Sequence, residues 1–323
     1  MLDATSVEVI RITNALSGAT VARCARMSRP RQVLPNQFWM ITRNCTQRQF
    51  LLRPDDVTNE AFAYCLAEAA QRFDIDVVLP MAESNHHHTT IYDRHGVFPA
   101  FMEHFHKMIA RCMNARWGRW ENFWAAEEVC VTRLLTRETV MDKLVYGATN
   151  PVKDLLVDEA WQWPGFNGYR LLLQGGSMRV RRPAHFFRQD GVMPEEVTLT
   201  LVIPPELGER GAVIDELRAR VREVEEATRA HRHATGRRVL GKKRVAQQLW
   251  RDSPTSVEPR RTLRPRFAGP VDARLAALVE YKEFLAIYDD AREAWLHGRA
   301  ATFPVGTYWL ARFAPISIGA PPS

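Results

Sequence analysis

The chain has 323 residues, 46% of them hydrophobic and 25% charged, with a formal net charge of +7, and this composition is typical of a globular protein of one or two domains. Its five cysteines are scattered without a Cys-x-x-Cys pair, which argues against a disulfide framework and a zinc ribbon and favours a reducing compartment. No apolar run reaches the ~18 residues of a membrane span and the N-terminus lacks a secretory signal pattern, so we expect a soluble cytoplasmic protein without a membrane partner.

Residues 36–176 carry the elements of a first domain, after an N-terminal lead-in, residues 1–35, with little pattern. Aromatic and β-branched runs predict four strands, at Phe38–Thr46, Asp74–Leu79, Ser84–Tyr92 and Glu127–Leu135. Apolar residues at helical spacing predict helices at Thr58–Phe73, at Phe98–Asn114 and from Thr136 onward. The order β-α-β-β-α-β-α is the ferredoxin-like split βαβ arrangement with one extra helix. We therefore expect an α+β fold, with an RRM-like antiparallel sheet that has helices on one face and leaves the other face open.

Three consecutive histidines open the predicted strand at Ser84–Tyr92. Successive side chains of a strand face opposite sides, so His86 and His88 share a face while His87 points away. Two neutral imidazoles on one face can bind the same divalent cation. A polar edge strand is the alternative, and for an isolated His-x-His pair it is the more frequent one.

A second candidate group lies in the stretch LVYGATNPV, where Tyr146 and Asn150 stand at i and i+4. On a helix this spacing puts a phenol and an amide on one face, within about 6 Å. Pro151 disfavours helix at the residue before it, so the helix is expected to end or kink at Asn150. A buried aromatic residue and a helix cap are the alternatives, but the coincidence with the histidine strand favours a catalytic site.

Between these groups, the segment Asn114–Trp124, NARWGRWENFW, interleaves tryptophan with arginine. Such residues can stack on bases and contact phosphates. The alternative is that the tryptophans cover the sheet, and for Trp124 this is the favoured interpretation. We predict that Arg116 and Arg119 contact DNA.

Beyond residue 176 the sequence predicts a mainly helical, basic extension. It comprises a strand and helix segment at 177–252, a Pro/Arg-rich linker at 253–270 and a C-terminal helical segment at 271–323. From Arg218 to Arg266 there are fifteen Lys and Arg against five Asp and Glu, so the positive charge of the chain is concentrated here and a polyanion is the expected partner. The predicted DNA contacts in this region are Arg237, Arg238, Lys242, Lys243 and Arg244.

Four motifs between Phe38 and Gly175 together resemble the HUH-superfamily single-tyrosine transposases, in particular the REP-associated tyrosine transposases of the IS200-like group. The segment from Ser84 to His88 resembles their Met-x-Asn-His-hydrophobic-His motif, except that His87 replaces the hydrophobic residue. The segment from Tyr146 to Val152 matches a Tyr-x-x-x-Asn-Pro-Val helix end. NARWGRWENFW resembles an Asn-Arg-x-x-Gly-Arg-x-x-x-x-Trp pattern, and QWPGFNGYR resembles Trp-Pro-x-x-x-Tyr.

The resemblance implies the HUH fold and a metal-dependent endonuclease and transesterase. His86, His88 and Asn150 would hold one Mg²⁺ or Mn²⁺, ions suited to nitrogen and oxygen ligands and to a phosphate oxygen. Tyr146 would attack a phosphodiester of single-stranded DNA near a hairpin or palindromic repeat, leaving a 5′-phosphotyrosine and a free 3′-hydroxyl that allows rejoining. The protein would then be associated with the nucleoid of a prokaryotic cell.

Two other functions remain open at this point. One is a domesticated protein that binds hairpin DNA without cleaving it. The other is an RNA-binding module, although the Lys/Arg-Gly-Phe-Gly-Phe signature of the RRM is absent. The sequence leaves open which hairpin is bound, and whether the protein acts as a monomer or as a homodimer.

Overall fold

The computed structural model describes residues 29–255 and 265–320. The chain divides into two compact units, Val33–Glu280 and the combination of Met1–Gln32 with Tyr281–Ser323. Most of the predicted N-terminal lead-in and the middle of the predicted Pro/Arg-rich linker lie outside the described residues. None of the described helices is long and apolar enough to cross a membrane.

A five-stranded sheet forms the centre of the first unit, with its strands in the order β2-β3-β1-β4-β7. The strands are β1 (Gln37–Asn44), β2 (Asp76–Glu83), β3 (His86–Asp93), β4 (Cys130–Leu134) and β7 (Phe267–Ala268). The first four pair with one another in antiparallel orientation, whereas β7 pairs with β4 in parallel, so that part of the predicted linker forms a strand. The order of the first four is that of the split βαβ arrangement, so the predicted ferredoxin-like α+β fold is confirmed.

Three helices complete this arrangement, namely α3 (Asp56–Phe73), α4 (Phe98–Trp117) and α5 (Arg137–Lys153). Each begins where a side chain accepts hydrogen bonds from the free amides of the first turn. The acceptors are Asp55 for α3, Asp93 for α4 and Thr136 for α5. Local capping therefore sets where each helix begins relative to the strand before it.

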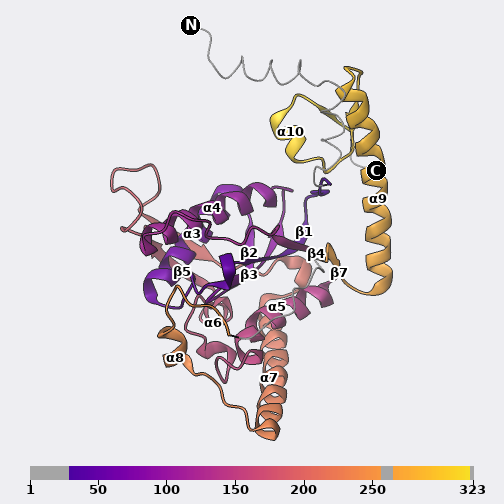
Figure 1. Ribbon diagram of the computed structural model, residues 1–323. Helices are drawn as coiled ribbons and strands as arrows, with labels where there is room; N and C mark the ends of the chain where they lie inside the picture. Colours follow the sequence, from indigo (N-terminus) through magenta and orange to yellow (C-terminus); the bar gives the residue numbers. More distant parts are fainter. Residues whose placement is uncertain (1–28, 256–264, 321–323) are drawn as a thin grey trace. The chain divides into compact units, whose positions relative to one another are not determined.

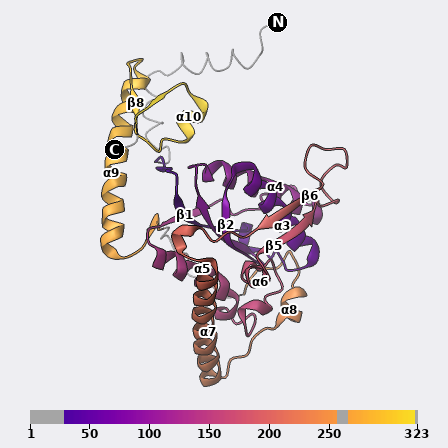
Figure 2. The same cartoon turned by 180° about the vertical axis from the view of Figure 1, so that it is seen from behind.

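The helices α3 and α4 cover one face of the sheet and α5 lies against the other (Figures 1 and 2). The apolar side of α5, including Val140, Leu144 and Ala148, is fully buried. The expectation of an open sheet face is therefore wrong, because the extra helix after the split βαβ unit occupies that face. In an RRM, nucleotides stack on the exposed face of the sheet. In the described part of this chain, α5 covers that face.

The helix α5 continues past Asn150 to Lys153, so the prediction that it could end at Asn150 is wrong, whereas the predicted kink stays a prediction. Pro151 removes one backbone donor, but it does so in the last turn, where only one hydrogen bond is lost. The backbone amides of Asp154 and Leu156 then bond back to Asn150 and Pro151. Asn150 is therefore held in helical geometry by residues on both sides.

The extension packs on the same unit. Its elements are β5 (Ser177–Arg181), β6 (Glu196–Thr200), a 3₁₀ turn at Pro205–Leu207, α7 (Arg210–Thr235) and α8 (Lys242–Ala246). Before it, the unit also contains α6 (Gly168–Leu173) and 3₁₀ turns at Thr46–Arg48 and Ala160–Gln162. The hairpin of β5 and β6 lies against α3, and α7 lies against α5. Arg220 of α7 pairs with Glu138 and Asp142 of α5. The segment 177–252 is thus an integral part of the first unit, and α7 supports the helix that carries Tyr146.

The second unit contains the C-terminal part of α9 (Val271–Leu296), followed by β8 (Thr302–Phe303), α10 (Trp309–Phe313) and β9 (Ser317–Ile318). The strands β8 and β9 pair in parallel. Within this unit the Tyr281 hydroxyl donates to the Pro30 carbonyl over 2.7 Å.

Candidate metal centre and nucleophile

The hairpin of β2 and β3 places three side chains that could hold a metal ion on one face of the sheet. A two-residue turn at Ser84 and Asn85 makes Glu83 the direct partner of His86. The possible ligand atoms of Glu83, His86 and His88 all lie within 4.8 Å of one another. The Nε2 atoms of His86 and His88 are 3.2 Å apart, and Oε1 of Glu83 is 3.5 Å from Nε2 of His86.

Asn150 reaches this group from α5. Its Nδ2 donates to Glu83 Oε1 over 2.5 Å and lies 3.2 Å from His86 Nε2 and 3.4 Å from His88 Nε2. The structure thus brings together the three side chains that the sequence singles out as metal ligands. We call Glu83, His86, His88 and Asn150 the metal cluster.

Glu83 is the member that the sequence analysis missed. It is 2% exposed, so its carboxylate is buried at the centre of the cluster. A signal for it was present in the sequence, because a two-residue hairpin turn at Ser84 and Asn85 puts the residue before the turn opposite His86 and on the same face. The histidine spacing identifies His86 and His88, and the two-residue turn is the further pattern that identifies Glu83.

The donors of the metal cluster fit a divalent cation. Neighbouring ligands bonded at about 2.0–2.2 Å lie about 3 Å apart, and the histidine nitrogens are 3.2 Å apart. Asn85 Oδ1 accepts from Nδ1 of His86 over 2.7 Å, which leaves the lone pair of Nε2 facing the cluster. Burial, together with the charges of His86, His87 and Lys143, lowers the pKa of His88 well below its ordinary value, and a metal ligand has to be neutral. A half-turn of the Asn150 amide would present its oxygen.

Tyr146 lies at the rim of the metal cluster, one helical turn before Asn150. Its ring is 5.3 Å from the His88 ring, and the residue is 38% exposed. The ammonium groups of Lys143 and Lys153 lie 5.4 Å and 5.5 Å from the centre of the Tyr146 ring. An accessible phenol flanked by two positive charges is well placed to meet an anionic substrate.

His87 faces the opposite side of the sheet, toward α4, and is fully buried. Arg43 donates to Nδ1 of His106 over 2.9 Å, so Nε2 of His106 carries the proton and donates to Nε2 of His87, also over 2.9 Å. His87 then donates from Nδ1 to Thr89 Oγ1 over 3.0 Å. The departure from the hydrophobic residue of the motif is therefore compensated by a complete hydrogen-bond chain, and the ligand face is unchanged.

The two predicted DNA contacts near α4 are engaged within the chain. Arg116 donates to both carboxylate oxygens of Asp55, the cap of α3, over 2.6 Å and 2.9 Å. Arg119 donates to the side-chain oxygen of Gln49 over 3.1 Å. Their contact with DNA stays a prediction, and the structure gives each of them a structural role.

The other predicted DNA contacts lie in or next to a stretch that returns to the metal cluster, residues 240–252, which we call the return segment. Leu240 donates to the Leu155 carbonyl after α5, and Gln248 accepts from the Ser84 hydroxyl in the turn of the cluster. Trp250 stacks on Trp117 with ring centres 5.7 Å apart. The basic residues are all exposed, with Lys242, Lys243 and Arg244 on α8 and Arg237 and Arg238 in the loop before it.

No family model matches the sequence, and no curated protein matches it. Among solved structures, the chain is similar to a REP-associated tyrosine transposase bound to a REP hairpin, with 16% identity and a TM-score of 0.39, over 46% of this chain and 87% of that one. It is also similar to a putative transposase from Deinococcus radiodurans R1, with 18% identity and a TM-score of 0.26, over 32% of this chain and 84% of that one. Similarity at these values carries no argument about activity.

Proposed function

We propose that the protein is a metal-dependent endonuclease and transesterase that acts on single-stranded DNA near a hairpin, as an HUH single-tyrosine transposase of the REP-associated kind. One observation carries the proposal. His86, His88 and Asn150, from two separate elements, converge within 3.4 Å of one another, and an exposed phenol lies one helical turn away. The four sequence motifs support the same conclusion.

The metal cluster would hold one Mg²⁺ or Mn²⁺ through the two histidine Nε2 atoms, the Asn150 amide oxygen and the Glu83 carboxylate. Mixed nitrogen and oxygen donors suit Mn²⁺, and the carboxylate also suits Mg²⁺. When bound, the cation polarises the scissile phosphodiester and neutralises the charge that develops on it.

Tyr146 would act as the nucleophile. Its hydroxyl oxygen forms a bond to phosphorus while the bond from phosphorus to the 3′ oxygen breaks, and the phenol proton is balanced by the proton that the departing 3′-hydroxyl acquires. The product is a 5′-phosphotyrosine, and attack by another 3′-hydroxyl reverses the step and joins the strands without ATP. Lys143 and Lys153 would attract the phosphate to the phenol.

The exposed basic residues of α8 would contact the DNA backbone beside the metal cluster. The hydrogen bond between Gln248 and Ser84 supports this, because it ties the return segment to the turn that follows Glu83. The matching test is a triple α8 variant, Lys242→Gln, Lys243→Gln and Arg244→Gln. Substitution is preferable to deletion of the extension, because deletion would also remove α7 from α5.

The proposed metal site can be tested by nicking. His86→Ala, His88→Ala and the double variant should lose Mg²⁺- or Mn²⁺-dependent nicking of a single-stranded hairpin substrate and keep hairpin binding. His95→Ala is the matched control, because His95 is exposed and pairs with Asp74 at the far end of β3. Nicking that persists in the double variant would remove the metal cluster from the mechanism.

A further inference from the structure

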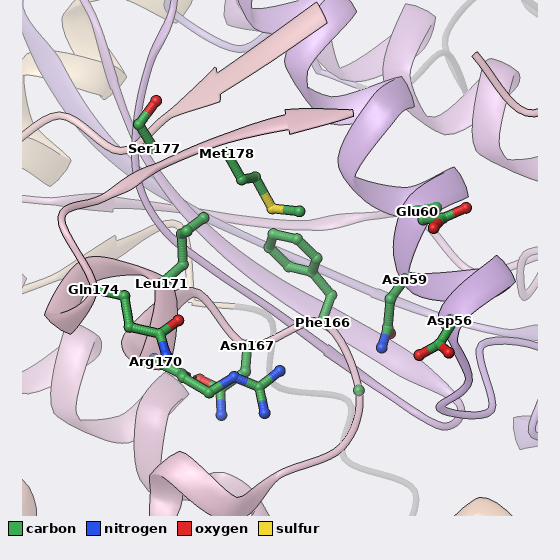
Figure 3. Close-up of a pocket in the computed structure, with 11 residues that line it drawn as sticks. Asp56, Asn59, Glu60, Phe166, Asn167, Arg170, Leu171, Gln174, Ser177 and Met178 are labelled. Carbon is green, nitrogen blue, oxygen red and sulfur yellow. Dashed lines mark hydrogen bonds between the residues drawn. The ribbon is translucent and has the colours of Figure 1, made fainter. Parts of the chain in front are cut away.

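A cavity of about 410 Å³ lies between the first turns of α3 and the segment from Gly165 to Met178 (Figure 3). Asp56, Asn59 and Glu60 line the α3 side, and Phe166, Arg170 and Met178 contribute to the rest of the lining. Clefts of this size with apolar walls and a few polar groups are typical of small-molecule and base-sized ligands. The proposed chemistry at the metal cluster does not use this cavity.

The apolar part of the cavity is formed by the packed side chain of Phe166. Phe166 is 5% exposed, and its ring packs against that of Phe62 with centres 5.2 Å apart. Met178 lines the same cavity, and Figure 3 labels both residues. A planar aromatic ligand that enters here would meet a preorganised apolar surface.

On the α3 side, the cavity is lined by carboxylates, which disfavour an anionic group of a ligand. The carboxylates of Asp56 and Glu60 make no hydrogen bond or ion pair with any residue that the structure describes, so both can accept hydrogen bonds from a ligand. Carboxylates repel phosphate, but they accept hydrogen bonds from the exocyclic amino groups of bases. Arg170 supplies a positive charge in the same cavity for a phosphate.

The cavity wall is hydrogen-bonded to β2 one residue before the metal cluster, while the Phe166 ring packs on the α3 side of the sheet, against Phe62, which also contacts the His87 ring. The Phe166 carbonyl accepts from the Ala82 amide over 3.0 Å, and Trp163 Nε1 donates to the Ala82 carbonyl over 2.8 Å. Ala82 immediately precedes Glu83, and strand residues advance by about 3.3 Å. Gly165 makes this approach possible, since a Cβ there would lie 2.6 Å from the Ala82 carbonyl oxygen. Because β2 is an edge strand, a single strand of DNA held at the cluster would enter the cavity by passing around this edge of the sheet.

We propose that this cavity is a base pocket, which binds one unstacked nucleobase bearing an exocyclic amino group, from the DNA strand that enters the metal cluster. The base would lie against Phe166 and Met178, and its amino group would donate to Glu60 or Asp56. Thymine lacks the amino group and can offer these carboxylates only its N3–H, which is flanked by two carbonyl oxygens that the carboxylates repel, so it is disfavoured at this position. The inference rests on the proposed function, because it names a recognition element for the same DNA.

The test is a selection without divalent metal, so that binding is measured without cleavage. The probe is a library of DNA hairpins with one fixed stem and randomised single-stranded flanks. Wild-type protein should deplete thymine at one flank position, and an abasic site there should weaken binding about 5- to 150-fold, the range for loss of one stacked base. The variant Asp56→Asn/Glu60→Gln should lose the discrimination against thymine at this position alone.

Two further variants complete the design. Met178→Trp fills the cavity, so it should remove the abasic penalty, and urea unfolding checks that it is folded. Glu103→Gln changes an exposed carboxylate on α4 and should behave as wild type. If the wild-type protein nicks and binds the hairpins but the flank preference is the same in all variants, the base pocket is refuted and the proposed function stands. Absence of hairpin binding by the wild-type protein would overturn both.

Discussion

Replacing His87 with leucine restores the hydrophobic residue of the motif, yet we expect the substitution to destabilise the fold. The Nε2–H of His106, which is 2% exposed, donates to His87 over 2.9 Å and would lose its acceptor. A buried polar group left without a partner costs about 1–3 kcal/mol. The free energy of unfolding of His87→Leu should therefore fall by about this amount, although leucine is the more apolar side chain.

A double-mutant cycle with His106→Leu isolates the hydrogen bond. Because both singles break the same interaction, the double variant should be less destabilised than the sum of the singles, by about 0.5–3 kcal/mol. Urea unfolding followed by circular dichroism gives the three differences, provided that the slope with urea is unchanged. Strictly additive effects would refute the hydrogen-bond chain from Arg43 to Thr89.

The same variants have a predicted pH dependence. Burial, followed by the positive charges of Arg43 and His86, lowers the pKa of His87 to about 3, and burial also lowers the pKa of His106. An unfolded histidine binds a proton below pH ~6.5. Between the lowered pKa of the folded state and ~6.5, the unfolded state therefore binds more protons than the folded state. The free energy of unfolding falls as the pH drops below ~6.5, by up to ~1.4 kcal/mol per pH unit for each histidine. The double variant should lose less stability in acid than the wild type.

Three other predictions follow from the site and its surroundings. Glu83→Gln should weaken Mn²⁺ binding by about tenfold or more, measured by titration calorimetry, and unchanged affinity would remove Glu83 from the ligands. The triple α8 variant should bind hairpins more weakly, and its log–log salt dependence should be flatter by ~0.7–0.9 per lost phosphate contact, whereas an unchanged slope would mean that α8 faces something other than DNA. Arg116→Lys keeps the charge but loses the paired hydrogen bonds to Asp55, so it should lower the free energy of unfolding by ~1–2 kcal/mol in urea with hairpin affinity preserved; reduced affinity in a stable protein would favour the DNA contact.

Much of the fold was predictable because it depends on local patterns. The predicted cap Thr136 begins α5, and the four strands of the first domain carry aromatic and β-branched runs. The start of α3 was predicted less well, because its cap is Asp55, three residues before the predicted start at Thr58. The position of α5 could not be predicted in this way. Its helical periodicity shows that one side is buried, but it does not show which surface that side packs against. The strand β7 is only two residues long, and its pairing with β4 depends on contacts far along the chain.

The site was predictable where backbone periodicity decides it. The two-residue repeat of a strand put His86 and His88 on one face, and the helical repeat put Tyr146 beside Asn150. The partner of His87 could not be predicted, because His106 is 19 residues away on α4 and has no motif of its own. The intrachain pairing of Arg116 was equally hidden, since Asp55 lies 61 residues from it.

The most direct test of the account is to trap the covalent intermediate on Tyr146. A phenol has an unperturbed pKa near ~10, so attack at neutral pH depends on the groups assembled around it. With a single-stranded hairpin labelled on the 3′ side of the cut and Mn²⁺ present, wild-type protein should acquire the label in a denaturation-resistant adduct. Tyr146→Phe should bind the hairpin and acquire none, and Tyr169→Phe, which changes a buried tyrosine, is the control that should still form the adduct.

Peptide mapping should place the adduct on Tyr146. An adduct on any other tyrosine would contradict the assignment, and cleavage by Tyr146→Phe would indicate an activated water and a hydrolytic enzyme. Tight hairpin binding by the wild-type protein with neither cleavage nor adduct would contradict the central claim and would identify a DNA-binding protein without nuclease activity.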